Sequence, residues 1–185
     1  ITVGRHPTND KISFIDVDNR TGASTAVSYL FSTGRRRIAT ITGPHNMIAG
    51  IDRLEGYYDA LSAANLPLDE SLVVEGNFTD SGGYIAMQQL LPAKPDAVFV
   101  ASDSMAMSAM RAIQDAGLCV PTDIAVIGFD DIPEAARVSP PLTTICQPTQ
   151  LIGATAAQTL VDMITHPTDE PRRVTLPTEL IIRAS

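Results

Sequence analysis

The sequence predicts an α/β fold in which a parallel sheet carries helices on both of its faces. Short runs rich in β-branched residues alternate with longer helical patterns along the chain, an order typical of βαβ units. Two runs, Ala97–Ala101 and Ile124–Phe129, are apolar almost throughout, as expected of central parallel strands that are covered on both faces. A length of 185 residues suits one ordinary domain, or one complete lobe with part of a second.

The remaining elements follow from hydrophobic spacing and from the residues at which helices begin and end. The helix expected at Thr21–Thr33 has apolar residues on one side, and the helix expected at Ser81–Leu91 follows a cap at Asp80. The last helix, Leu151–Thr165, ends before Pro167. The other strands are expected at Lys11–Asp16, Arg37–Thr42, Ser71–Glu75 and Glu179–Arg183, and the other helices at Ala49–Asn65 and Ser104–Ala116.

The composition indicates a folded, acidic protein. Hydrophobic residues make up 44% of the chain and charged residues 18%, which is enough apolar material for a packed core. The formal net charge is −8. Binding to nucleic acid needs clustered lysine and arginine, and the basic run at Arg35–Arg37 is too short to supply it. The chain itself is therefore not expected to bind nucleic acid directly.

Several classes of site are not expected from the motifs. Cys119 and Cys146 match neither a disulfide framework nor a metal-ligand spacing, and they fit a cytoplasmic location. His6, His45 and His166 are scattered, so neither a metal nor a cofactor is expected. The sequence contains no run of about 18 apolar residues, so no membrane span is expected. Glycine-rich phosphate loops and nucleophile–base patterns are also absent from the sequence, so enzymatic activity is not expected.

The chain changes character after the strand at Ile124–Phe129. It becomes rich in proline and loops, then forms one more helix and a final extended segment that contains Pro171 and Pro177. This pattern is expected of a chain that leaves one compact unit, contacts another and returns. The opening residues Ile1–Gly4 read as the middle of a strand, so we expect the chain to be a piece of a longer protein.

Polar loops follow four of the expected strands, at Gly43–His45, Gly76–Phe78, Ser102–Asp103 and Asp130–Asp131. Ligands of open α/β sheets bind outside the carboxyl ends of the strands, and Arg53 in a following helix is expected to reach the same edge. One cation, several carboxylates and an aromatic ring suit a small molecule that is rich in hydroxyl or amide groups.

Each of these residues also has a purely structural interpretation. Asp80 and Asp103 belong to the residue types favoured as helix caps, and the Asp130–Asp131 pair fits a solvated turn. Phe78 fits the edge of the core, and Arg53 fits a surface ion pair with a neighbouring carboxylate.

Ten short segments, in order along the whole chain, carry a recognisable pattern. They are Val17–Asn19, Gly22–Ala23, Gly34–Ala39, Arg53–Tyr57, Gly76–Phe78, Ser102–Ala106, Val120–Ile124, Gly128–Asp131, Pro141–Ile145 and Leu176–Arg183. Together they resemble the LacI/GalR family of transcription regulators. So many matches in one order are more specific than any single motif.

The resemblance implies a periplasmic-binding-protein-like core of two lobes behind an N-terminal helix-turn-helix. Residues 1–18 would then be part of the N-terminal lobe, and residues 19–145 the complete C-terminal lobe. Residues 146–168 would form a crossover and a helix that returns to the N-terminal lobe. Residues 169–185 would form the terminal strand segment of the C-terminal lobe.

The resemblance also implies a set of ligand contacts. Arg53 matches an arginine that forks to ligand hydroxyls or a carboxylate, and Asp130 matches a carboxylate that accepts from hydroxyls or amines. Phe78 matches an aromatic residue that stacks on the ligand. Asp18 and Gln147 match contacts from the first lobe or the hinge.

Two positions depart from the family pattern. Ser102 stands at a ligand-binding position where asparagine is common, and this removes a group that both donates and accepts hydrogen bonds. Ala49 stands where serine is frequent. The site is therefore expected to have fewer polar groups than a typical sugar site.

The predicted function is that of the effector-sensing core of a regulator, a repressor, that acts on DNA. A small polar ligand such as a sugar or nucleoside would bind between the lobes and change the DNA affinity of an intact homodimer. The methionine-rich face at Met105, Met107 and Met110 is expected in core packing or in the subunit interface. The alternatives are a periplasmic sugar-binding protein of a transporter, which needs a signal peptide, and a small α/β enzyme.

We predict that this chain by itself does not bind operator DNA. Its net charge is −8, and the helix-turn-helix that reads DNA in the family is not among the motifs it carries. Electrophoretic mobility-shift assays with candidate operator duplexes provide the measurement. Specific retardation of a duplex by this chain would contradict the prediction.

Overall fold

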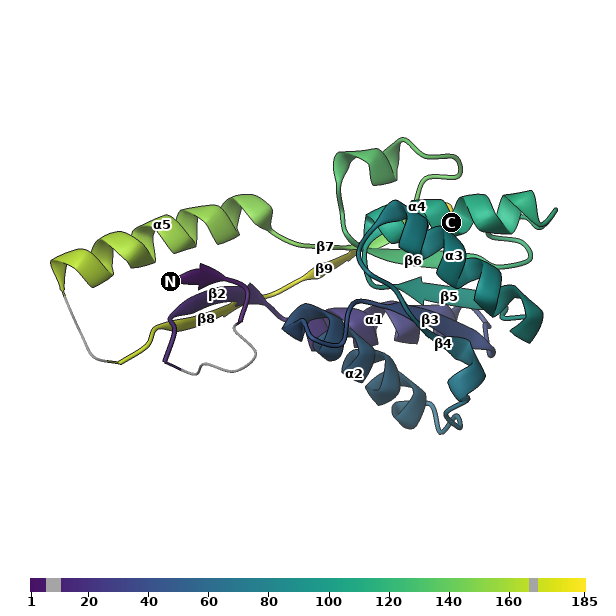
Figure 1. Ribbon diagram of the computed structural model, residues 1–185, viewed down its shortest axis with the longest axis horizontal. Helices are drawn as coiled ribbons and strands as arrows, with labels where there is room; N and C mark the ends of the chain where they lie inside the picture. The colour runs from purple at the N-terminus through teal and green to yellow at the C-terminus, as the bar shows by residue number, and fades with distance from the viewer. Residues whose placement is uncertain (6–10, 167–169) are drawn as a thin grey trace.

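A computed structural model of the protein, which describes residues 1–5, 11–166 and 170–185, confirms the α/β fold. The described strands form a large sheet with helices on both faces and a small sheet with one helix (Figure 1). His6 and Pro167, which the sequence singled out, lie outside the described residues.

The large sheet is parallel except at one edge. Its strands follow the order β4-β3-β5-β6-β7-β9, and β9 alone among them runs antiparallel, to its neighbour β7. The continuous apolar character of β5 and β6 places them at the centre, as expected. The bounds are β3 (Ile38–Thr42), β4 (Val73–Glu75), β5 (Ala97–Val100), β6 (Ala125–Asp130), β7 (Thr143–Cys146) and β9 (Glu179–Ile181).

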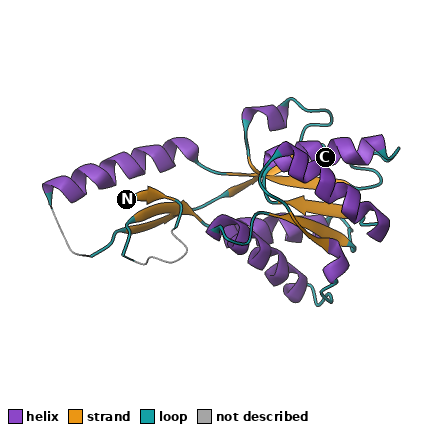
Figure 2. Cartoon of the chain, in the orientation of Figure 1, coloured by secondary structure: helices purple, strands orange, loops and turns teal. Residues whose placement is uncertain are grey.

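Two pairs of helices cover the large sheet, as Figure 2 shows. The helices α1 (Asn19–Ser32) and α2 (Ile48–Ala63) pack on one face, and α3 (Asp80–Leu90) and α4 (Asp103–Asp115) pack on the other. Alternate residues of β5 serve the two sides. Ala97 and Phe99 pack towards α1 and α2, whereas Val98 and Val100 pack towards α3 and α4.

The small sheet holds three parallel strands in the order β1-β2-β8. Their bounds are β1 (Thr2–Val3), β2 (Phe14–Val17) and β8 (Arg173–Leu176), and the helix α5 (Thr149–Thr165) lies over them. Ile152 of α5 packs against Ile15 and Val17 of β2 in a separate small core.

Between described elements the chain passes three times from one sheet to the other. The passages lead from β2 to α1, from β7 to α5, and from β8 to β9 (Figure 1). They account for the loop-rich segment that the sequence indicated. One expected boundary differs: residues 169–185 were assigned wholly to the larger unit, yet β8 pairs with β2 in the small sheet.

Local hydrogen bonds shorten or displace several expected elements. Asp69 accepts hydrogen bonds from the backbone and the hydroxyl of Ser71, and this turns Glu70–Leu72 into a 3-10 helix before β4 begins. Two further 3-10 turns lie at Leu91–Ala93 and Pro133–Ala136. The strand β1 lies within Ile1–Gly4, where the sequence indicated a strand. The short strands β7 and β8 were not among the expected strand runs, because four residues carry too weak a pattern.

The caps of two helices are one residue earlier than expected. The hydroxyl of Thr79, not the carboxylate of Asp80, accepts from the backbone N–H of Gly82 at the start of α3. Likewise Ser102, not Asp103, caps α4 by accepting from the N–H of Met105. Serine, threonine and aspartate share the same capping chemistry, so adjacent candidates cannot be ranked by residue type.

Within the ranges that the structure describes, no helix has both the length and the hydropathy needed to cross a bilayer.

A matched pair of glycines tests the packing of α1 on α2. A side chain at Gly56 of α2 would overlap the backbone carbonyl of Arg20 and the side chain of Ala23, whereas a side chain at Gly153 of α5 would meet open space. We expect Gly56→Ala to lower the free energy of unfolding by about 1–3 kcal/mol through overpacking. Gly153→Ala should raise it by about 0.5–1 kcal/mol through helix propensity.

Urea unfolding of both variants provides the measurement. Equal effects of the two substitutions would show that α1 and α2 do not approach each other as closely as described.

Candidate functional site

The carboxyl ends of the parallel strands lie at the edge of the large sheet that faces the small sheet. Strands β3, β4, β5, β6 and β7 run in one direction, and the chain leaves β7 directly for α5 (Figure 1). The four polar loops that the sequence singled out therefore share this edge.

Arg53 is the central group at this edge. It lies on α2 and is only 5% exposed. Its Nε donates to Oδ1 of Asn19 at 2.8 Å, and its Nη1 donates to the backbone carbonyl of Ala101 at 2.5 Å. The guanidinium carbon also lies over the buried ring of Phe129, 3.7 Å from the ring centre. Arg53 is thus a buried cation with partners on separate elements, and the surface ion pair that was the alternative is wrong.

Asp130, at the end of β6, supplies the opposite charge. Its Oδ1 lies 3.4 Å from Nη1 of Arg53 and accepts a 2.6 Å hydrogen bond from Nε2 of Gln147. Burial raises the pKa of Asp130, and attraction to the Arg53 guanidinium counteracts this rise. Burial lowers the pKa of Arg53, against the attraction of Asp130 and Asp16. The two charges therefore depend on each other.

An aromatic face completes this group of side chains. Phe78, which follows β4, is half-buried and its ring centre lies 5.9 Å from the guanidinium carbon of Arg53. We call Asn19, Arg53, Phe78, Asp130 and Gln147 the Arg53 cluster. It combines a forked donor, a carboxylate acceptor, two side-chain amides and an apolar ring.

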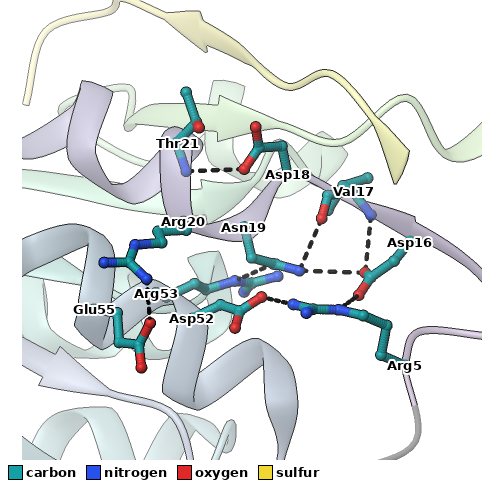
Figure 3. A network of polar contacts seen from close by, with 10 residues as sticks. All are labelled: Arg5, Asp16, Val17, Asp18, Asn19, Arg20, Thr21, Asp52, Arg53 and Glu55. Carbon is teal, nitrogen blue, oxygen red and sulfur yellow. Dashed lines mark hydrogen bonds and ion pairs between the residues drawn. The ribbon is translucent and has the colours of Figure 1, made fainter. Parts of the chain in front are cut away.

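The Arg53 cluster continues into a network that joins the two sheets (Figure 3). Nδ2 of Asn19 donates to Asp16 of β2 at 3.2 Å and to the backbone carbonyl of Val17. Arg5, which follows β1, forms ion pairs with Asp16 at 3.1 Å and with Asp52 of α2. Asn19 therefore links the small sheet to Arg53 of α2, and Arg5 links it to Asp52 of the same helix.

A hollow of about 380 Å³ lies next to this network. It is bounded by residues of the small sheet, of α1 and α2, and of the chain beside them. These residues are Arg5, Val17, Asp18, Asn19, Arg20, Asp52, Glu55 and Thr175.

The structure brings together four of the six residues that the sequence assigned to the ligand. Arg53, Phe78, Asp130 and Gln147 form one contiguous group, as described above. Asp18 instead accepts from the backbone N–H of Thr21 at 3.0 Å and caps α1.

Ser102, the sixth of these residues, is 5% exposed and caps α4. Its neighbour Ala101 supplies the carbonyl that holds Arg53. Met105 and Met110 lie in the core against the sheet, in agreement with the packing interpretation of the methionine-rich face.

Three residues of this network, Asn19, Asp16 and Arg5, were not among those expected at the site from the sequence. Asn19 lies within the motif that carried the family resemblance, directly after Asp18, and its position at the first turn of a helix was the available signal. No sequence signal indicated Asp16 and Arg5, because their pairing depends on the register of β1 on β2.

Within ranges 1–5, 11–166 and 170–185, histidine, cysteine and carboxylate side chains do not gather in any group of three or more suited to a metal ion.

Known families and proteins share this architecture. The model of the periplasmic binding protein-like domain family matches residues 27–185. The chain is 47% identical over 178 residues to the HTH-type transcriptional regulator CelR of Thermobifida fusca, which covers 95% of this chain and 52% of that protein. It is 44% identical over 166 residues to the ribose operon repressor of Escherichia coli strain K12, which covers 89% of this chain and 50% of the repressor. The chain spans about half the length of these curated relatives.

Solved structures agree with the sequence comparisons. A complex of the transcriptional regulator CelR with cellobiose matches with a TM-score of 0.95 and 45% identity, over 100% of this chain and 58% of that chain. A LacI family regulator from Enterococcus faecium with bound ribose matches with a TM-score of 0.89 and 28% identity, over 100% of this chain and 69% of the other. The chain therefore belongs to the periplasmic binding protein-like domain family, in the form carried by transcriptional regulators of the LacI/GalR family.

Proposed function

We propose that the chain is the effector-sensing part of a transcriptional regulator, a repressor, and that the Arg53 cluster binds a small hydroxyl-rich ligand of the sugar class. The ligand would lie between the two sheets and make contacts with both. In the intact homodimer its binding would change the affinity for DNA, which a helix-turn-helix domain would contact. This protein would act in the cytoplasm and would catalyse no reaction.

The observation that carries the proposal is the arrangement of donors and acceptors around Arg53. A sugar hydroxyl both donates and accepts, so it needs a donor and an acceptor within reach of each other. Arg53 and Asp130 meet this need at 3.4 Å, and the amide of Gln147 adds a further donor. The ring of Phe78 offers an apolar face to the carbon skeleton of the ligand.

The relatives favour a regulator over a transporter component. CelR and the ribose operon repressor are both named as regulators of transcription, at 47% and 44% identity. Matching structures were solved with cellobiose in one case and ribose in another. These names support a sugar as the ligand of this chain and weigh against the transporter and enzyme alternatives.

The network in Figure 3 supplies a physical route from ligand to conformation. Asn19 binds both Arg53 and Asp16, so a change at the guanidinium reaches the small sheet through one side chain. A ligand that binds one arrangement of the two sheets more tightly shifts the equilibrium by that difference in affinity. We infer that this shift is the signal sent towards DNA.

A sugar should stabilise the folded chain. At ten times its dissociation constant, a ligand that binds only the folded state adds about 1.4 kcal/mol to the free energy of unfolding. Such a gain raises the melting temperature of a chain of this size by about 3–6 °C. Thermal unfolding with cellobiose and with ribose, each at millimolar concentrations, provides the measurement. The absence of any shift with both sugars and with a wider panel of neutral saccharides would contradict the proposal.

Conservative changes within the Arg53 cluster should weaken sugar binding. Arg53→Lys keeps the positive charge but loses the planar guanidinium group that can donate two parallel hydrogen bonds. Asp130→Asn keeps the shape of the side chain but loses the negative charge. A hydrogen bond to a charged group contributes about 1.5–3 kcal/mol, so each variant should raise the dissociation constant for cellobiose about tenfold or more. Isothermal titration calorimetry provides the measurement.

The matched control for these variants is Asp59→Asn. Asp59 pairs with Arg20 on the exposed surface of α1 and α2, and it belongs neither to the Arg53 cluster nor to the residues around the hollow. Its replacement should leave the affinity for cellobiose unchanged. Unchanged affinity in both Arg53→Lys and Asp130→Asn would place the sugar elsewhere.

A further inference from the structure

The backbone that presents Asp130 has an unfavourable conformation. Asp130 and Asp131 have φ angles of +123° and +57°, in the region that side-chain-bearing residues rarely adopt. Two such residues in succession persist only where the surrounding structure holds them. The groups that hold this turn therefore determine where the Asp130 carboxylate points.

Asp103 holds the turn from inside the protein. The residue is fully buried at the first position of α4. Its Oδ2 accepts a 3.0 Å hydrogen bond from the backbone N–H of Ile132, directly after the two strained residues. Its Oδ1 accepts a 2.5 Å hydrogen bond from the hydroxyl of Thr144 on β7. Asp103 thus ties the turn to α4 and to the neighbouring strand.

The fit around the Asp103 carboxylate is close. A side chain at Gly128 of β6 would overlap Oδ1 of Asp103, so the carboxylate occupies the space that glycine leaves above the strand. On the outer side of the turn, Asp131 accepts a 2.6 Å hydrogen bond from Arg183, and the backbone carbonyl of Asp130 accepts from the backbone N–H of Gln147 at 3.4 Å.

We propose that Asp103 is a positioning residue, which directs the Asp130 carboxylate towards Arg53 and Gln147 by holding the N–H of Ile132. This inference rests on the proposed function of the Arg53 cluster. Asp103 itself does not contact the ligand, because it is enclosed between α4, β6 and β7.

Amide hydrogen exchange tests the proposal without any ligand. In Asp103→Ala the N–H of Ile132 loses its acceptor, so we expect its exchange rate to rise at least tenfold relative to core amides of β5. The side-chain amide signals of Gln147 should also move in the NMR spectrum, because its acceptor on Asp130 is displaced. In Asp103→Asn the amide oxygen still accepts from Ile132, so both signals should stay near their wild-type values.

Two controls separate positioning from general loss of stability. Ile113→Val removes a methylene from the core of α4, far along the helix from Asp103, and should raise exchange without a preference for Ile132. Where Asp103→Ala fails to fold, Thr144→Val removes the hydroxyl that orients Asp103 and should raise the exchange of Ile132 more than Ile113→Val does. Unchanged exchange at Ile132 in a folded Asp103→Ala chain, or the absence of any preference in Thr144→Val, would overturn the proposal.

Sugar affinity gives the functional readout. With cellobiose as the probe, Asp103→Ala should raise the dissociation constant about tenfold, while Asp103→Asn and Ile113→Val should leave it within about twofold. Failure of the wild-type chain to bind any sugar would contradict the proposed function, whereas the exchange of Ile132 would still decide the role of Asp103. Wild-type affinity in Asp103→Ala would overturn the positioning role.

The pH dependence of stability tests the burial of Asp103. Burial raises the pKa of Asp103 to about 7, against hydrogen bonds from Thr144 and Ile132 that lower it. Asp130 and Asp131 add to the rise, and Arg53 and Arg183 are the cations near these carboxylates.

The folded chain therefore holds a proton on Asp103 that the unfolded chain releases near pH 4, so stability is lost as the pH rises from about 4 to about 7. Between pH 5 and pH 8 the melting temperature of the wild type should fall by several degrees relative to Asp103→Asn. A constant difference would contradict a raised pKa for Asp103, whereas the exchange of Ile132 would still decide its positioning role.

Discussion

The burial of Arg53 is the constraint on which the rest of the site depends. A guanidinium group removed from water must be met by acceptors, and leaving it unpaired would be strongly destabilising. Here the acceptors come from three elements: Asn19 at the start of α1, the carbonyl of Ala101 after β5, and Asp130 at the end of β6. These elements meet because parallel strands end at one edge of the sheet. The fold thus positions the acceptors, and the cation in turn links the ends of β5 and β6 to the start of α1.

The same constraint couples the two sheets. Asn19 has one amide group, whose oxygen accepts from Arg53 and whose nitrogen donates to Asp16 and Val17 in the small sheet. Arg5 spans the same junction through Asp16 and Asp52. A ligand that competes for Arg53 would therefore change the hydrogen bonds that determine how the sheets sit against each other. Separate binding and hinge regions are not needed in such an arrangement.

Most of the fold and much of the site were predictable from sequence, for a specific reason. Short β-branched or continuously apolar runs and helical spacing are local signals, and the rule for strand ends converts them into the position of Arg53, Phe78 and Asp130. The predictions that failed depended on pairing between distant residues, or on a choice between adjacent residues with similar side-chain chemistry. The pairing of β8 with β2 joins residues far apart in sequence. Local patterns could not tell that Asp18 caps α1 while Asn19, the next residue, binds Arg53.

The strained turn after β6 explains why carboxylates stand where the backbone favours glycine. A glycine at either position would relax the φ angles of Asp130 and Asp131, yet it would remove the acceptor for Arg53 and Gln147 or the partner of Arg183. Backbone strain of this kind persists where surrounding contacts hold it, and it is common at binding sites. On the buried side of the turn, Asp103 is itself in an unfavourable position, because burial of its carboxylate raises its pKa despite the hydrogen bonds that it accepts. The unfavourable features of this region, a buried acid and a strained backbone, thus act together to keep one carboxylate in place.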